Sequence, residues 1–342
     1  MKFLTALAAA ILAWRTAGFA QSQAHRVVVA ANGSGDFKTV QEAIDHTTGD
    51  TIIAIRPGTY REKISIARDN IWLAGLGASP ADVVLSFGDS AKTAGGTGKS
   101  GSVTVVNDGF AAENLTIVNT WWEEHPDPAD ASQAVALLIR SGHAVVDRVR
   151  LISGQDTLYA DSRTCRNDTG DTPCEASRQL FNDCYIEGHV DYIFGDAKAV
   201  FQSCELHSRP HGAVMVTAQS KHFPGEDSGY YFLECKITGA NNGNRVVLGR
   251  PWRDYATVLF YKTDIEQQIA PEGWSEWSGR LKTATYREYK SHGPGVNAGR
   301  RIVEYPLLTP EEEARLTIPD LLSGKEPWDP MAMVKTLRSL VK

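Results

Sequence analysis

Short apolar runs rich in β-branched residues recur along most of the chain, separated by polar turn residues. Most are about four to seven residues long and are bounded by Gly, Asn, Asp or Pro, a pattern typical of β-strands. Helical periodicity is scarce over the same region, which excludes a helical protein. We predict strands at 26–31, 51–55, 64–66, 71–73, 83–85, 103–106, 114–118, 134–139, 144–149, 177–186, 199–204, 214–217, 230–237, 245–248 and 257–261.

Helices are predicted only near the two ends of the chain. Residues 39–46 place Val40, Ala43 and Ile44 on one side of a short N-terminal helix. Near the C-terminus, Thr309 and Pro310 before three glutamates form a strong helix start. Residues 327–342 suggest another short helix. We expect these C-terminal segments to cover an end or an open edge of the strand region.

One short phrase recurs along the strand region: a polar pair followed by an apolar–polar–apolar run. Its copies begin at Glu113, Asp147, Asn182, Gln202 and Leu233, with spacings of 34, 35, 20 and 31 residues. A β-sandwich remains possible, but such scatter suits stacked coils with variable loops. We therefore predict an all-β protein, a right-handed parallel β-helix. Residues 90–101 look like an exposed loop, and no linker divides the single domain expected over 21–342.

The N-terminus resembles an export signal. Lys2, an apolar run from Phe3 to Trp14 and small residues before Gln21 predict a signal peptide over residues 1–20, and hence a secreted or periplasmic protein. No later run is longer, so we expect no membrane partner. Without the signal, 33 basic and 41 acidic residues give a formal charge of −8, which disfavours nucleic acid.

The five cysteines suit an oxidising compartment, and an odd count leaves at least one unpaired. Cys165 and Cys174 bracket a polar, turn-rich segment that a disulfide would close. No cysteine or histidine spacing matches a zinc site, so we expect no metal and no cofactor.

Two acids occupy unusual surroundings. Asp156 and Asp191 each lie among apolar and glycine residues, where a carboxyl group has a raised pKa unless a partner compensates. They are 35 residues apart. In stacked coils, residues one coil apart are neighbours about 5 Å apart, so the pair can share one site. One acid can then be ionised as a nucleophile while the other holds a proton.

Three further polar residues can complete such a site. Arg250, between Gly249 and Pro251, is the best cation to hold an ionised acid, because a guanidinium binds a carboxylate through two parallel hydrogen bonds. Gln155 and Gln133 supply neutral amide donors suited to an oxyanion that forms only in the transition state. Alone, either glutamine could equally belong to a ladder inside the solenoid.

Five blocks, in order, resemble the pectin methylesterases, which remove methyl groups from polygalacturonate. They are Gly58-Thr59-Tyr60-Arg61-Glu62, Gln133-Ala134-Val135-Ala136-Leu137, Gly154-Gln155-Asp156-Thr157-Leu158-Tyr159, Ile186-Glu187-Gly188-His189-Val190-Asp191-Tyr192-Ile193-Phe194-Gly195 and Leu248-Gly249-Arg250-Pro251-Trp252. The stretch from Gly33 to Ile44 extends the resemblance towards the N-terminus. Tyr192 departs from the phenylalanine of many members, a change we expect to be tolerated.

The resemblance implies a role for each catalytic candidate. Asp191 would attack the ester carbonyl, held and ionised by Arg250. Gln133 and Gln155 would stabilise the oxyanion, and Asp156 would act as acid and then as base. Trp252, Phe194, Tyr159 and Val190 would bind the sugar chain, and Trp121 and Trp122 could extend that groove.

The resemblance also implies a partner and a disulfide. Methyl-esterified homogalacturonan would be the substrate of a monomeric enzyme, and Cys184–Cys204 would be the core disulfide, leaving Cys235 free. The 165–174 segment looks like an insertion near the cleft. Three alternatives stay open: an esterase for another ester or thioester, a β-helix polysaccharide lyase or hydrolase, and a non-catalytic carbohydrate-binding solenoid.

Overall fold

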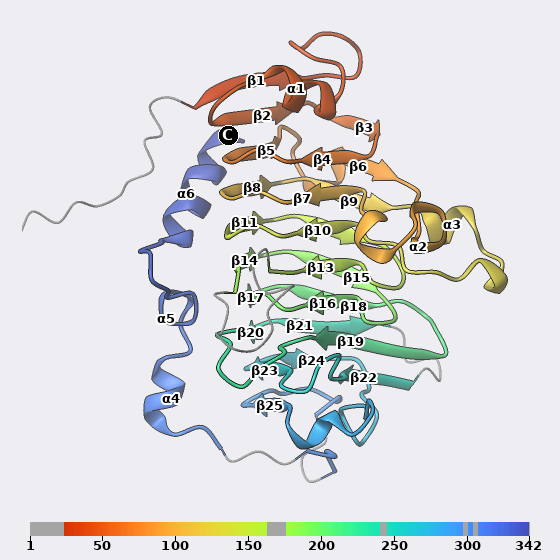
Figure 1. Ribbon diagram of the computed structural model, residues 1–342, viewed down its shortest axis with the longest axis vertical. Coiled ribbons are helices and arrows are strands. Elements are labelled where there is room, and N and C mark those ends of the chain that lie inside the picture. Colours follow the sequence, from red (N-terminus) through yellow and green to blue (C-terminus); the bar gives the residue numbers. More distant parts are fainter. Residues whose placement is uncertain (1–23, 163–175, 240–244, 297–299, 304–306, 342) are drawn as a thin grey trace, which may run out of the picture.

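The chain winds into stacked coils whose strands form three parallel sheets (Figure 1). The computed structural model describes residues 24–162, 176–239, 245–296, 300–303 and 307–341. All strand pairs between neighbouring coils are parallel, as the β-helix prediction requires. The predicted signal peptide, with Cys165 and Cys174, lies outside the described residues.

Each sheet takes one strand from each successive coil. The ten-stranded sheet contains β1 (His25–Val29), β2 (Thr51–Ile55), β5 (Ile71–Gly75), β8 (Phe110–Glu113), β11 (His143–Asp147), β14 (Arg178–Asn182), β17 (Lys198–Gln202), β20 (Gly229–Leu233), β23 (Thr257–Tyr261) and β25 (Thr285–Tyr289). The eight-stranded sheet contains β3 (Gly58–Arg61), β6 (Val83–Phe87), β9 (Thr116–Asn119), β12 (Arg150–Ile152), β15 (Tyr185–Gly188), β18 (Glu205–Ser208), β21 (Lys236–Gly239) and β24 (Asp264–Ile265). The seven-stranded sheet contains β4 (Ile64–Ile66), β7 (Val103–Val105), β10 (Leu137–Ile139), β13 (Leu158–Ala160), β16 (Ile193–Gly195), β19 (Ala213–Gln219) and β22 (Arg245–Gly249).

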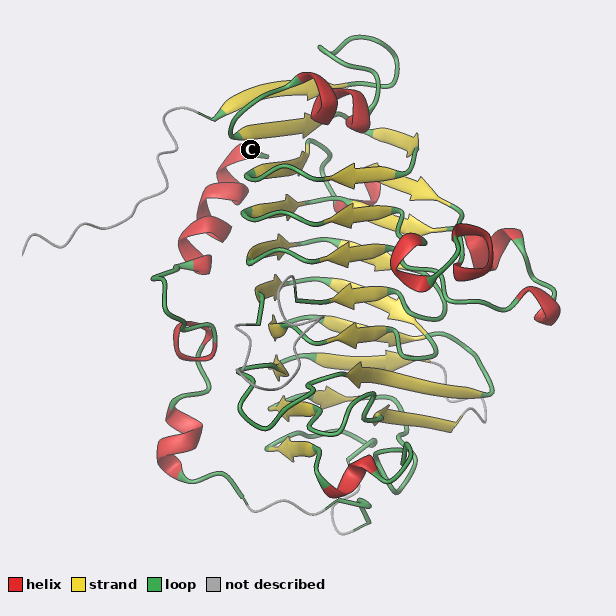
Figure 2. Cartoon of the chain, in the orientation of Figure 1, coloured by secondary structure: helices red, strands yellow, loops and turns green. Residues whose placement is uncertain are grey.

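Helices are short and lie outside the coils (Figure 2). They are α1 (Val40–His46), α2 (Ala91–Ala94), α3 (Trp121–Glu124), α4 (Pro310–Ala314), α5 (Ile318–Leu321) and α6 (Pro330–Leu340), with 3-10 turns η1 (Pro80–Asp82), η2 (Thr97–Lys99), η3 (Pro128–Asp130) and η5 (Arg280–Lys282). In the described part of the chain, every helix is too short or too polar to cross a bilayer.

The recurring phrase forms one corner of the coil. Its second residue has a positive φ in every copy, between 49° and 56°, where the chain leaves the ten-stranded sheet for the eight-stranded one. These residues are Asn114, Arg148, Asp183, Ser203 and Glu234. One left-handed residue turns the chain sharply, so the apolar residue after it points into the core.

The same corner explains where the strand prediction was wrong. The ranges 177–186 and 230–237 were each predicted as one strand, but each divides into two strands of different sheets. The divisions fall at Asp183 and Glu234, the left-handed residues. The apolar pattern runs on across the corner because both flanking strands face the same core, so the pattern alone does not show the turn.

Three cysteines follow corner residues in successive coils. Cys184, Cys204 and Cys235 are buried free thiols, so the expected Cys184–Cys204 disulfide is wrong. Each Sγ instead approaches a carbonyl oxygen of the preceding coil: Cys184 that of Val146 at 3.3 Å, Cys204 that of Phe181 at 3.4 Å and Cys235 that of Phe201 at 3.2 Å. The thiols therefore act as small core residues.

The C-terminal segment covers the outer face of the ten-stranded sheet, rather than an end or an open edge as expected (Figure 1). Residues on that face, such as Val145 and Leu259, pack in one apolar cluster with residues of the segment, such as Leu322 and Leu337. The predicted helix start at Thr309 is confirmed, because its side chain caps α4 in a capping box. Helix α6 begins at Pro330, three residues later than predicted.

A cluster of charged residues around the buried carboxyl groups of Asp147 and Glu113 anchors α6 to the sheet. Arg338 binds Asp147 through Nε at 2.7 Å and Nη2 at 2.9 Å, and Asn182 donates to the same carboxylate at 2.6 Å. Asp147 pairs in register with Glu113, to which Arg148 donates through Nε at 2.7 Å. Burial and the neighbouring Asp147 raise the pKa of Glu113 to about 8.

We expect this raised pKa to make folding stability fall with pH. Between the ordinary glutamate pKa of 4.5 and about 8, Glu113 keeps its proton in the folded state but loses it in the unfolded state. Its contribution to the free energy of unfolding is therefore fully present below pH 4.5 and is lost as pH rises through about 8. The Glu113→Gln side chain cannot titrate, so the melting temperature of this variant should rise relative to that of the wild type as pH increases across that window. Thermal unfolding at several pH values tests this, and parallel curves for both proteins would contradict it.

Candidate active site

The two aspartates singled out in the sequence lie at the same position in adjacent coils. β13 pairs with β16 with Leu158 opposite Ile193, a 35-residue offset, and Asp156 and Asp191 each stand two residues before these partners. The N–H of Asp156 donates to the carbonyl of Val190 at 3.0 Å. Both aspartates have positive φ, 66° and 50°, a conformation that Asp and Asn tolerate better than most residues.

Arg250 binds Asp191 as predicted. Its Nε donates to Oδ1 at 2.8 Å and its Nη2 to Oδ2 at 2.6 Å, the two-point geometry of a strong guanidinium–carboxylate pair. Arg250 follows β22, and its guanidinium carbon also lies 4.1 Å from the ring centroid of Trp277. Arg250 is therefore fixed from two sides with its charge directed at Asp191.

The two carboxyl groups differ in their electrostatics. Burial raises the pKa of Asp191, and the Arg250 guanidinium opposes that rise. Burial raises the pKa of Asp156 further, well above its usual range, and the adjacent Asp191 adds to the shift. Asp191 therefore ionises before Asp156, and the pair can hold one charge and one proton together.

A groove of about 910 Å³ exposes these groups over the seven-stranded sheet. Its lining includes all five catalytic candidates, Gln133, Gln155, Asp156, Asp191 and Arg250. Tyr159, Phe194 and Trp252 form an aromatic cluster in its wall, with the Tyr159 and Phe194 rings stacked at 4.1 Å between centroids. Aromatic faces of this kind can support the apolar face of a sugar ring.

Three of the expected groove residues are placed elsewhere. Val190 is absent from the lining, and its backbone holds Asp156 instead. Trp121 is buried, and its indole donates to the carbonyl of Asp130 at 3.1 Å. Trp122 packs edge-on to His189 at 4.5 Å between centroids, and both rings crowd Gly154, where a Cβ would meet them at 2.5–2.6 Å. The rings of Trp122 and His189 therefore support the Gly154–Asp156 turn from outside the groove lining.

A second stacked acid pair lines the groove and was missed. Asp161 and Asp196 follow β13 and β16, again 35 residues apart, a spacing that could have identified them. Arg140 donates through Nε to Asp161 at 2.6 Å, and the backbone N–H of Ser162 donates to Asp196 at 2.6 Å. Burial, followed by the charge of Asp161, raises the pKa of Asp196 well above its usual range. Trp277 was also missed, because it lies in an irregular segment without a strand pattern.

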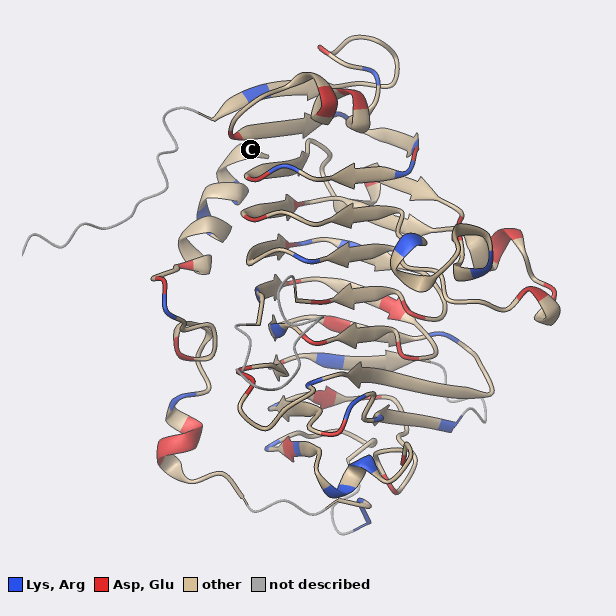
Figure 3. Cartoon of the chain, in the orientation of Figure 1, with Lys and Arg blue, Asp and Glu red and all other residues tan. Residues whose placement is uncertain are grey.

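Within the described ranges, no group of three or more His, Cys, Asp or Glu residues could hold a metal ion. Figure 3 shows acidic and basic residues interspersed along the coils. The catalytic candidates bring carboxyl, amide and guanidinium groups into the groove.

The fold and the groove define a parallel β-helix protein with a stacked carboxyl pair in a groove over one of its sheets. The model of the pectinesterase family matches residues 26–324, and the chain belongs to this family. "Probable pectinesterase/pectinesterase inhibitor 17" of Arabidopsis thaliana is 34% identical over 90% of this chain and 58% of its own length. "Putative pectinesterase 14" of the same plant is 33% identical over 87% and 86%.

Solved structures show the same fold. The pectin methylesterase from carrot superposes with a TM-score of 0.76 and 29% identity, covering 91% of this chain and 95% of the carrot chain. PemA from Erwinia chrysanthemi has a TM-score of 0.72 and 26% identity, with 90% and 99% covered. The chain spans less than three fifths of the length of the first two curated relatives it matches.

Proposed function

We propose that this chain is an exported pectin methylesterase, a carboxylic ester hydrolase that converts methyl-esterified polygalacturonate to pectate and methanol. The observation that carries the proposal is the Arg250–Asp191 ion pair one coil away from Asp156, whose pKa burial raises well above its usual range. Family membership favours this activity over a lyase or a binding solenoid. The N-terminal pattern of residues 1–20 supports export.

In the proposed first half-reaction, an Asp191 oxygen attacks the ester carbonyl carbon. The carbonyl π electrons move to its oxygen, and the amides of Gln133 and Gln155 donate to this oxyanion. As the tetrahedral intermediate collapses, the bond to the methoxy oxygen breaks and Asp156 gives that oxygen its proton. Methanol leaves, and the substrate acyl group remains on Asp191 as an anhydride.

In the second half-reaction, Asp156 is ionised and acts as a base. It takes a proton from water, whose oxygen attacks the acyl carbon, and the Asp191 carboxylate departs. This departure restores the ionised Asp191 carboxylate, which pairs with Arg250 again. Each turnover consumes one water and releases one methanol, one new polymer carboxylate and one proton.

The direct test is methanol release from highly methylated pectin, with a simple acyl-thioester substrate in parallel. Release from pectin by the folded protein supports the proposal. Turnover of the thioester without methanol from pectin would instead favour a family relative that acts on another acyl group.

The pKa order of the two acids predicts a bell-shaped pH profile of kcat/KM. Activity needs Asp191 ionised, and burial raises the pKa of Asp191, so the ascending limb of the profile should lie above the usual aspartate pKa of 3.8. Activity also needs Asp156 protonated, and its larger pKa rise places the descending limb at higher pH. Initial rates of methanol release across pH measure both limbs. A rate that rises without a descending limb would contradict a protonated Asp156 in the first step.

A further inference from the structure

His189 stands between the two turns that carry the catalytic aspartates. It lies two residues before Asp191, and its backbone N–H donates to the carbonyl of Gly154, two residues before Asp156, at 3.0 Å. His189 is only 4% exposed, and it is not among the described residues that line the groove. It can therefore affect both acids without touching the substrate.

The His189 ring makes a hydrogen bond to the turn of the nucleophile. Its Nδ1 accepts the N–H of Val190 at 2.8 Å, so Nδ1 carries no proton. The carbonyl of Val190 in turn accepts the N–H of Asp156 at 3.0 Å. Val190 thus joins the His189 ring to Asp156, directly beside Asp191. Burial lowers the pKa of His189 to about 3, which keeps the ring neutral and Nδ1 available as an acceptor.

The same ring packs against the turn of Asp156. Its Nε2 and the Trp122 ring both lie over Gly154, where a Cβ would meet them at 2.6 and 2.5 Å. The two rings meet edge-on, with 4.5 Å between their centroids. One buried imidazole therefore contacts both catalytic turns, one through a hydrogen bond and the other through packing.

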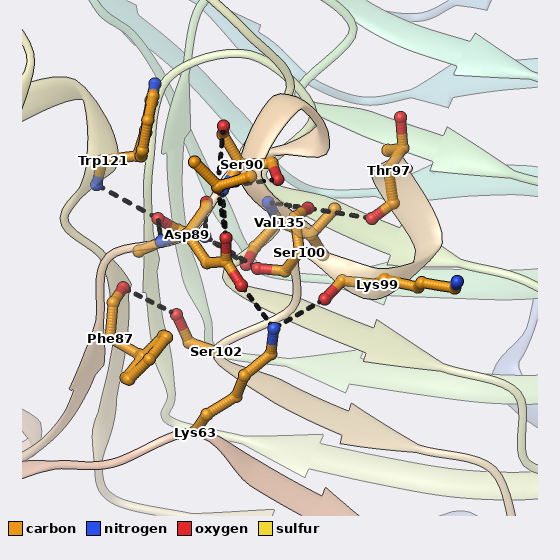
Figure 4. Close-up of polar contacts among 12 residues, drawn as sticks. Lys63, Phe87, Asp89, Ser90, Thr97, Lys99, Ser100, Ser102, Trp121 and Val135 are labelled. Atoms are coloured by element: carbon orange, nitrogen blue, oxygen red, sulfur yellow. Dashed lines mark hydrogen bonds and ion pairs between the residues drawn. The ribbon is translucent and has the colours of Figure 1, made fainter. Parts of the chain in front are cut away.

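The start of α3, which carries Trp122, is held by a polar cluster that also holds residues 90–101 (Figure 4). The N–H of Trp121 donates to Oδ1 of buried Asn119 at 3.1 Å, and the Asn119 amide donates to the carbonyl of Ser100 at 3.0 Å. Residues 90–101, expected to be an exposed loop, instead contain α2 and η2 and contribute to the groove lining. Trp122 is therefore tied to a structured part of the fold.

We propose that His189 is a positioning residue, whose ring fixes the relative placement of the Asp191 and Asp156 turns for attack on the ester. The Nδ1 hydrogen bond orients the backbone just before Asp191, and the ring packing holds Gly154 just before Asp156. A displacement of about 1 Å in such an arrangement can cost about 10²-fold in rate. This inference rests on the proposed function.

The test compares His189→Asn with His189→Leu, two side chains of nearly the same shape that both lose the ring. The asparagine Oδ1 can take the place of Nδ1 and accept the Val190 N–H, whereas leucine leaves that N–H without its acceptor. We expect kcat for methanol release to be about tenfold or more lower in His189→Leu than in His189→Asn. KM should be equal in the two variants, because position 189 does not line the groove.

His207 provides the matched control. Its Nδ1 is hydrogen-bonded to the Thr238 hydroxyl at 2.8 Å, and it lies in β18, outside the groove lining. The variants His207→Asn and His207→Leu should have the same kcat and the same KM. Loss of packing is common to both members of each pair, so a kcat difference found only at His189 reports the Nδ1 hydrogen bond.

Equal kcat in His189→Asn and His189→Leu, or the same kcat ratio at His207, would overturn the inference while leaving the esterase proposal intact. If the wild type releases no methanol from pectin, the proposed function fails separately, and amide hydrogen exchange then decides. The Val190 and Asp156 amides should exchange faster in His189→Leu than in His189→Asn, and equal exchange would refute the positioning role. Should His189→Leu not fold, His189→Phe takes its place, because it keeps a ring and lacks the acceptor.

Discussion

Replacing Asp191 with asparagine should lower kcat for methanol release by about 10⁴-fold or more, as loss of a covalent nucleophile does in other hydrolases. The amide cannot attack the ester carbonyl, so no acyl-enzyme forms. Asparagine is a better choice than alanine because the φ of 50° at this position favours Asp or Asn. Methanol release and thermal unfolding should be measured on the same preparation.

The fold should survive this change although Arg250 loses its charged partner. The Arg250 side chain is 25% exposed and remains stacked on Trp277. Asp183→Asn is the matched control, because Asp183 also has a positive φ, 55°, and its exposed side chain lies away from the groove lining. That variant should keep wild-type activity. If Asp191→Asn retained more than about a hundredth of wild-type kcat, the nucleophile assignment would be wrong.

Replacing Asp156 with asparagine should lower kcat on methyl esters by about 10²- to 10⁴-fold, the usual contribution of a general acid. Methoxide is a poor leaving group and needs the proton. An oligogalacturonate activated as its p-nitrophenyl ester does not, because p-nitrophenolate leaves unaided. The variant should therefore release about one equivalent of p-nitrophenol rapidly and then turn over slowly, since the second half-reaction lacks its base.

The rapid phase separates the two half-reactions. Mass spectrometry of protein quenched after the burst should find the acyl adduct on the peptide that contains Asp191. The combined variant Asp156→Asn, Asp191→Asn is the control and should show neither burst nor adduct. A single slow phase in Asp156→Asn, without a burst, would refute the assignment of Asp156 as acid and base.

Much of the fold could be predicted because the three sheets face one apolar core. Runs such as 51–55 and 257–261 match their strands at both ends. Predictions failed at Asp183 and Glu234, where a single backbone angle separates strands of different sheets without interrupting the apolar pattern. The disulfide prediction failed because parallel stacking directs each thiol towards a carbonyl of the coil before it.

The sequence by itself determined the catalytic candidates and placed two of them, Asp156 and Asp191, in adjacent coils. The 35-residue separation of Asp156 and Asp191 equals the offset of β13 and β16, so their adjacency follows from the repeat alone. Only the tertiary structure decided which side chains around them face the groove. Trp121, Trp122 and Val190 are absent from its lining, while Trp277, Asp196 and residues 95–99 contribute to it. The physical reason is that strand stacking is periodic and readable in sequence, whereas loop placement depends on contacts such as Lys63 with Asp89, which join residues far apart in the chain.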